Sequence, residues 1–280
     1  MTSHKPKIPQ SLISILESCQ NEDRDQHHFP PTEVFSETWM LRLVLDALEN
    51  LEKTVGVPET HPLKFCKGAK WYSEARLISP FRPTTKRDPL GESSTCADGV
   101  IGHFGFDQDR KAKLNLTPEA SQFIVVEAKM FSNLSSRTTH ALKYDQAART
   151  VACMATIMLE SKISLDTRKS RDFSVGFFVV APSLEKRNRN TNLETCLEPS
   201  SIRSAVNNRI AGYEKASREA DVRRPKQWEE QFLQLVDHLV KNNRLRVLDW
   251  DRDIIQPIAD IDKKIGEELH QFYKHCLNFA

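Results

Sequence analysis

The stretch of sequence that decides the fold is Gln122-Phe-Ile-Val-Val-Glu-Ala-Lys-Met130. Its apolar run predicts a strand, because the run has ordinary strand length and is rich in β-branched residues. Residues i and i+2 of a strand point to one face, so Glu127 and Lys129 share a side. A packed strand has no structural need for two charges at its end, so this pair is a candidate for chemistry.

Two further runs upstream predict strands, over residues 71–79 and 96–104. A polar loop over 107–119 joins the second of them to the 122–130 strand, which favours an antiparallel pair with a long hairpin loop. Asp98 lies at the start of the 96–104 run. If the two strands pair, Asp98 comes close to Glu127 and Lys129.

Helical patterns flank these strands. Residues 36–52 form a helix with one apolar stripe, and either Thr32 or Ser36 is suited to cap it. A second helix, rich in small residues, is expected over 138–160. The continuous apolar run 173–181 is typical of a buried central strand. Further downstream the sequence predicts helices near 200–217, 225–242 and 259–276 and a short strand over 246–250.

The resulting order, α-β-β-β-α-β, predicts one mixed α/β domain. Residues 1–30 are expected to form a polar lead-in with a short helix near 11–18. Residues 31–280 are expected to form the domain, with its core over 33–182 and a mostly helical extension, including the added strand, over 183–280.

Composition excludes several classes of protein. The chain has 280 residues and a net charge of +2, and no stretch approaches ~18 consecutive apolar residues, so no membrane span is expected. The first residues have no apolar signal-peptide core, and the six cysteines are widely spaced without a CxxC pair. We therefore expect a cytoplasmic protein that does not associate with membranes.

The near-neutral charge is an average over unlike parts. Residues 1–63 hold 5 basic and 10 acidic side chains, residues 64–224 hold 27 and 18, and residues 225–280 hold 8 and 10. The middle block, at +9, contains Asp98, Glu127 and Lys129. Such segregation hints at an anionic partner.

The candidate residues suit phosphodiester hydrolysis. Two carboxylates, Asp98 and Glu127, together with the main-chain carbonyl of Ala128, offer hard oxygen ligands that suit Mg²⁺. A neighbouring lysine, Lys129, can orient a water, promote its deprotonation or stabilise charge on a phosphate.

At these residues the sequence resembles the PD-(D/E)XK, or restriction-endonuclease-like, nuclease superfamily. The match is Asp98, then 28 intervening residues, then Glu127-Ala-Lys129, and it covers roughly residues 33–182. Ala97 stands where the motif usually has Pro. The resemblance implies a restriction-endonuclease-like αβββαβ core, with a mixed central sheet flanked by helices. It also implies Mg²⁺, with Mn²⁺ as a substitute, and a nuclease that acts on DNA.

The resemblance also suggests supporting residues. Many members carry a further acid on the first helix, for which Glu37 is the candidate, while Glu74 on the first strand competes for that role. Members often carry Gln, Tyr or Arg on the helix after the Glu-x-Lys strand. Here Gln146 is the candidate for catalysis, and Arg149 and Tyr144 are the candidates for substrate binding.

Other interpretations stay open at this stage. Glu127 and Lys129 are equally consistent with a surface salt pair of an unrelated interaction protein, and Asp98-Gly99 with a turn. Glu37 also suits the first turn of a helix with no active site, and Tyr144 suits packing. The chain is expected to be an endodeoxyribonuclease; a catalytically inactive nucleic-acid-binding relative and an RNA-directed nuclease are the alternatives. Cutting both strands of a duplex often requires a homodimer.

Overall fold

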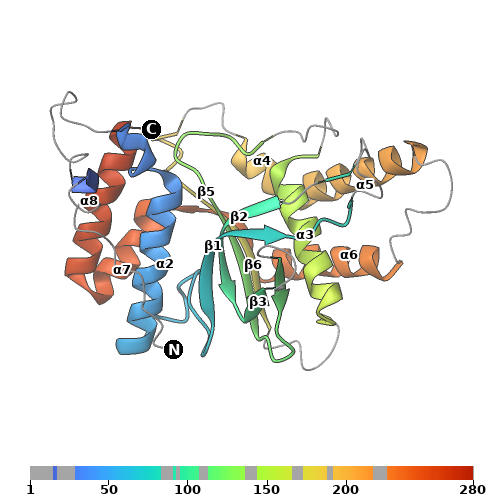
Figure 1. Cartoon of the computed structure of the whole chain (residues 1–280), viewed down its shortest axis with the longest axis horizontal. Helices are drawn as coiled ribbons and strands as arrows, with labels where there is room; N and C mark the ends of the chain where they lie inside the picture. Colours follow the sequence, from blue (N-terminus) through green and yellow to red (C-terminus); the bar gives the residue numbers. More distant parts are fainter. Residues whose placement is uncertain are drawn as a thin grey trace, which may run out of the picture.

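The structure is a computed structural model that describes residues 15–17, 29–82, 91–92, 95–106, 113–135, 144–165, 173–187, 192–216 and 226–279. It is a mixed α/β fold in which helices cover both faces of one five-stranded sheet (Figure 1). The prediction of a mixed α/β fold whose central sheet is flanked by helices is thereby confirmed. Most of the expected lead-in over 1–30 lies outside the described residues, although residues 15–17 are helical.

The sheet is mixed, with the strand order β1-β2-β5-β6-β7. Its first three strands pair antiparallel, and β5, β6 and β7 pair in parallel. The predicted antiparallel pairing of the second and third strands is confirmed, with Gly99 opposite Val126. The strands are β1 (Lys70–Leu77), β2 (Thr95–Gly102), β5 (Gln122–Ala128), β6 (Ser174–Ala181) and β7 (Leu245–Asp249).

The loop between β2 and β5 contains structure that the sequence did not predict. β3 (Phe104–Phe106) and β4 (Leu114–Leu116) pair antiparallel as a separate two-stranded sheet. Phe104, Leu114 and Leu116 are buried and join the main core. A three-residue strand is too short for alternation to be recognised, so this segment resembled a polar loop.

The helices form two layers, one on each face of the sheet (Figure 1). Each layer encloses its own apolar core because β5 and β6 turn alternate side chains to opposite faces. One face is covered by α2 (Glu37–Thr54), α7 (Gln256–Ile261) and α8 (Lys263–Phe279), and the other by α3 (Gln146–Glu160), α4 (Leu193–Leu197), α5 (Pro199–Ala216) and α6 (Lys226–Lys241).

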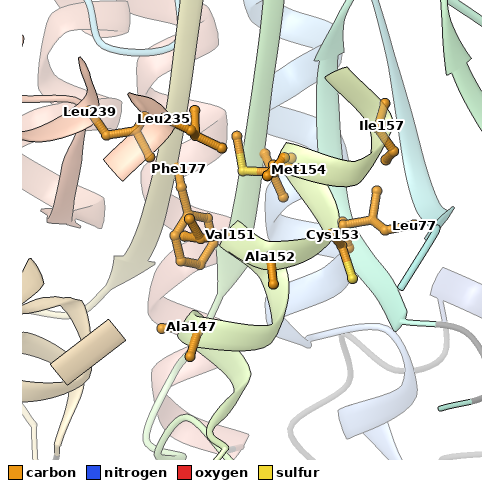
Figure 2. Packing of buried hydrophobic residues seen from close by; sticks show 14 of the residues in the cluster. Leu77, Ala147, Val151, Ala152, Cys153, Met154, Ile157, Phe177, Leu235 and Leu239 are labelled. Atoms are coloured by element: carbon orange, nitrogen blue, oxygen red, sulfur yellow. The ribbon is translucent and has the colours of Figure 1, made fainter. Parts of the chain in front are cut away.

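Helix α3 begins later than its sequence predicts. Residues 136–143 lie outside the described residues, and Tyr144 and Asp145 precede the helix. The Asp145 carboxylate accepts a hydrogen bond from the Ala148 N–H at 2.9 Å and so caps the helix at Gln146. Small residues such as Ala147 and Ala152 let α3 pack closely against the sheet and α6 (Figure 2).

The expected last helix over 259–276 is divided between two helices, α7 and α8, which an extended residue, Asp262, separates. A π-helical turn, η4 (Trp250–Ile255), leads into α7. The Asp262 carboxylate accepts a hydrogen bond from the Ile265 N–H at 3.1 Å, which starts α8 afresh. A side chain at Gly266 would place its Cβ 2.3 Å from that of Ala259, so glycine is needed for this close contact.

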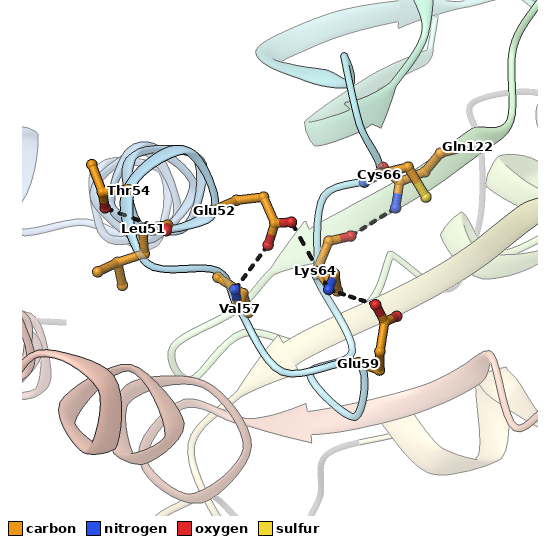
Figure 3. Close-up of polar contacts among 8 residues, drawn as sticks. All are labelled: Leu51, Glu52, Thr54, Val57, Glu59, Lys64, Cys66 and Gln122. Carbon is orange, nitrogen blue, oxygen red and sulfur yellow. Dashed lines mark hydrogen bonds and ion pairs between the residues drawn. The ribbon is translucent and has the colours of Figure 1, made fainter.

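The loop over 55–69 is fixed by polar contacts that Figure 3 shows. The Glu52 carboxylate accepts a hydrogen bond from the Val57 N–H at 2.9 Å. The buried Gln122 amide donates to the Lys64 carbonyl at 2.7 Å and accepts from the Cys66 N–H at 2.9 Å. These bonds join the loop to the start of β5.

No helix in the described part of the chain is long and apolar enough to cross a membrane.

The same loop buries a histidine whose titration gives a first prediction. His61 is buried, its Nδ1 accepts a hydrogen bond from the Leu63 N–H at 3.1 Å, and burial lowers its pKa to about 4. The unfolded chain protonates His61 below pH ~6.5, whereas the folded protein does not. The free energy of unfolding should therefore fall by up to about 3 kcal/mol between pH 6.5 and 4.

Denaturant titrations of the wild type and of His61→Asn over this pH range measure that loss. The variant keeps an acceptor but has no proton to gain, so its profile should be flatter. Parallel stability profiles for the two proteins would contradict the assignment of this pH dependence to His61.

Candidate active site

The end of β5 carries two charged side chains into a buried position. β5 is buried along its whole length. Phe123 and Val125 belong to the core on the α3 side, so Glu127 and Lys129, in the same alternation, turn to that side as well. Glu127 is only 2 % exposed and Lys129 9 %, and the Lys129 Nζ lies 2.6 Å from the Glu127 Oε1.

Asp98 reaches the same place from β2. The β2–β5 register puts Gly99 opposite Val126, so Asp98 is the next residue along, beside the end of β5. Its Oδ2 accepts a hydrogen bond from the Ala128 N–H at 2.8 Å and lies 4.0 Å from the Lys129 Nζ. The structure thus brings together three charged residues that lie far apart in sequence.

Two helices contribute side chains from their first turns. Gln146, the first residue of α3, donates a side-chain hydrogen bond to the Glu127 Oε1. Glu37, the first residue of α2, is half-buried, and burial raises its pKa, while Lys129 opposes and Asp98 adds to that rise. We call Asp98, Glu127, Lys129, Glu37 and Gln146 the carboxylate cluster.

The cluster holds more acidic than basic groups. Burial and the nearby Asp98 raise the pKa of Glu127 to about 8, and Lys129 opposes that rise. Burial alone would lower the pKa of Lys129, but the carboxylates of Glu127, Asp98 and Glu37 raise it instead. Lys129 therefore stays an ammonium, which favours charge stabilisation over the role of a base. Ionising all three carboxyl groups would leave two negative charges beyond the one that this ammonium balances.

The donor atoms suit a hard divalent cation. The Glu127 Oε2 is buried and has no hydrogen-bond partner among the described residues. The Ala128 carbonyl faces the same strand edge as its N–H, which binds Asp98. Within the described ranges, no group of three or more His, Cys, Asp or Glu side chains could hold a metal by itself. Two carboxylates and a carbonyl are compatible with Mg²⁺, which keeps several of its waters.

Glu74 lies beside the carboxylate cluster in an unusual conformation. Its φ is +57° within β1, between Ser73 opposite Gly99 and Ala75 opposite Ala97. Its carboxyl is exposed, and burial and Asp98 raise its pKa. A left-handed glutamate inside a strand is strained, and no local sequence pattern predicts it.

The two predicted substrate-binding residues, Tyr144 and Arg149, lie outside the carboxylate cluster, in different surroundings. Tyr144 is buried in the core, with its ring centroid 5.5 Å from that of Phe81, so the predicted contact with substrate does not fit its position. The sequence suggested packing as the alternative. Arg149 is half-buried on α3, and its charge is one of those that oppose the rise that burial causes in the pKa of Glu92. Its Nε is buried and has no hydrogen-bond partner in the described part of the chain.

Trp250 supports the cluster and was missed by sequence analysis. Its indole Nε1–H donates a hydrogen bond to the Lys129 carbonyl at 3.1 Å, and the side chain is fully buried. The bond fixes the backbone just after β5. A tryptophan at the end of the strand predicted over 246–250 was the only available signal, and it does not indicate a partner.

Comparisons with known proteins give no match: no family model, no curated protein and no solved structure is similar to this chain.

The buried ion pair predicts a pH-dependent loss of stability. Lys129→Met removes the cation that stabilises the ionised Glu127 carboxylate, so it should cost about 3–5 kcal/mol in the free energy of unfolding at pH 9, above the raised pKa of Glu127. At pH 5 the loss should be smaller, because Glu127 with its raised pKa can then bind a proton in the folded state.

Urea unfolding at both pH values measures the two losses. Lys129→Met combined with Glu127→Gln removes both charges and should recover most of the stability. An equal loss at both pH values in the single and double variants would mean that only packing of the lysine stem was lost.

Proposed function

We propose that this protein is a divalent-metal-dependent nuclease of the PD-(D/E)XK type that hydrolyses phosphodiester bonds. The observation that carries the proposal is the convergence of Asp98, Glu127 and Lys129 at the end of β5, with the Lys129 Nζ 2.6 Å from one carboxylate and 4.0 Å from the other. Counting only strands of the main sheet, the order helix α2, strands β1, β2 and β5, helix α3 and strand β6 agrees with the core that the resemblance implies, and the β3–β4 pair is inserted between β2 and β5.

Asp98, Glu127 and the Ala128 carbonyl would hold Mg²⁺, with Mn²⁺ as a substitute. When bound, the metal would polarise the phosphate and lower the pKa of a water. The chain's own residues would perform the remaining tasks. The Lys129 ammonium would stabilise negative charge on the phosphate, and Gln146 would orient the Glu127 carboxylate that it already contacts. Trp250 would hold the backbone at Lys129.

Two further features favour an anionic substrate. The first turns of α2 and α3 supply Glu37 and Gln146 to the carboxylate cluster, and helix N-termini carry partial positive charge that favours phosphate groups. The sequence block over 64–224, which contains most of the cluster, carries a net charge of +9 from 27 basic and 18 acidic residues. DNA is the favoured substrate by analogy with the superfamily, and RNA is tested beside it.

Cleavage should depend on the metal and on both carboxylates. We expect Mg²⁺- or Mn²⁺-dependent cleavage of DNA that EDTA abolishes. Asp98→Asn can still accept the Ala128 N–H and Glu127→Gln keeps the side chain's shape, so both should fold and lose at least ~10²-fold in kcat/KM. Supercoiled, linear and single-stranded DNA and RNA are the substrates to be assayed by gel.

Glu119→Gln removes an exposed carboxylate from the turn before β5 and serves as the control. It should cleave like the wild type. Cleavage that survives EDTA, or that both cluster variants retain, would refute the proposal. Salt-dependent binding of nucleic acid without cleavage would instead indicate an inactive relative.

Glu37, rather than Glu74, should support the metal. Lys129 influences the pKa of Glu37 but is not among the groups that shift the pKa of the exposed Glu74. Glu37→Gln should therefore raise the Mg²⁺ concentration for half-maximal cleavage by about 3- to 10-fold, and excess Mg²⁺ should restore the rate. Glu74→Gln should leave this concentration near that of the wild type. The opposite order of effects would assign the role to Glu74.

A further inference from the structure

An exposed tryptophan stands on the helix that supplies Glu37 to the carboxylate cluster. Trp39 is 43 % exposed and follows Glu37 by two residues, so its side chain leaves α2 on the opposite side of the helix. The other three tryptophans are more enclosed: Trp228 and Trp250 are buried and Trp71 is half-buried. Exposure of a large indole ring is costly, and neither packing nor catalysis as described accounts for it.

A cation backs the Trp39 ring and links it to the cluster. The Arg42 guanidinium carbon lies 4.7 Å from the ring centroid, which is a cation–π contact. The Arg42 Nε donates a hydrogen bond to the Ser73 hydroxyl at 2.9 Å, which fixes the guanidinium over β1. Ser73 lies opposite Gly99, the residue next to Asp98, so this hydrogen bond fixes Arg42 and the ring at the strand beside the cluster.

We propose that Trp39, backed by Arg42, is a stacking platform for an unpaired nucleobase within a few nucleotides of the scissile phosphate. Aromatic rings beside cations bind single strands, because every base has a π-face and every linkage a negative charge. A base paired in a duplex is already stacked on its neighbours and cannot cover the indole ring. The ligand is therefore a single-stranded segment of nucleic acid. This identity of the ligand rests on the proposed nuclease function.

Binding can be measured apart from cleavage through the emission of Trp39. The full-length protein in EDTA is titrated with a fluorescently labelled single-stranded DNA oligonucleotide and with the corresponding duplex. The single strand should quench tryptophan emission, because a stacked base quenches indole, and should bind more tightly than the duplex. Labelled oligonucleotide anisotropy gives the Kd independently of the tryptophan signal.

Three variants test whether Trp39 is responsible for the single-strand binding and for the quench. Trp39→Leu should weaken single-strand binding by about 10- to 100-fold, with a much smaller change for the duplex. Trp39→Phe keeps an aromatic face, so it should bind within a few-fold of the wild type while losing the quench. Leu233→Ala truncates a side chain that is 42 % exposed on α6, across the sheet from α2. It should change neither the Kd for the single strand nor the quench of tryptophan emission.

The outcomes separate the two proposals. If no nucleic acid is cleaved but the single strand quenches Trp39 and Trp39→Leu loses binding, the platform stands and the nuclease proposal fails. If cleavage requires Asp98 while Trp39→Leu binds and cleaves like the wild type, the platform is refuted and the nuclease proposal stands. The platform is also refuted if Trp39→Leu weakens the binding of single strand and duplex equally, or if the quench persists in Trp39→Phe.

Discussion

The burial of β5 on both faces is the constraint on which the rest of the structure depends. The strand pairs antiparallel with β2 and in parallel with β6, and every one of its residues is buried. A carboxylate at the end of such a strand loses its water, and only charged or hydrogen-bonding neighbours can compensate. Lys129 and Gln146 supply that compensation to Glu127, and Asp98 comes beside them because it binds the backbone of the same strand.

That compensation is incomplete, and its incompleteness is the basis of the functional proposal. Burial raises the pKa of both Glu37 and Glu127, with Asp98 adding to the rise, while a single ammonium serves all three carboxylates. The Glu127 Oε2 has no hydrogen-bond partner in the described part of the protein. An arrangement kept for stability alone would be expected to satisfy such an atom. A divalent cation would satisfy it and balance the excess charge.

Sequence analysis predicted the helices and strands that long periodic patterns determine. It did not predict the features that depend on contacts between residues distant in sequence. The apolar runs of β5 and β6 and the stripe of α2 were sufficient to place those elements, and strand alternation put Glu127 and Lys129 on one side. The start of α3 depends on the Asp145 cap, and the break between α7 and α8 on the contact of Gly266 with Ala259. The strained Glu74, the bond from Trp250 to Lys129 and the burial of Tyr144 depend on residues distant in sequence, which no local pattern shows.

The most direct test of the central claim, that the carboxylate cluster is a divalent metal site, is a crystal structure of the protein in Mn²⁺ with anomalous diffraction data. The account predicts an anomalous peak within coordination distance of the Asp98 and Glu127 carboxylates and the Ala128 carbonyl, with the Lys129 ammonium displaced from direct contact with the Glu127 Oε1. A cluster without a peak at saturating Mn²⁺, in which Lys129 still binds Glu127, would contradict it.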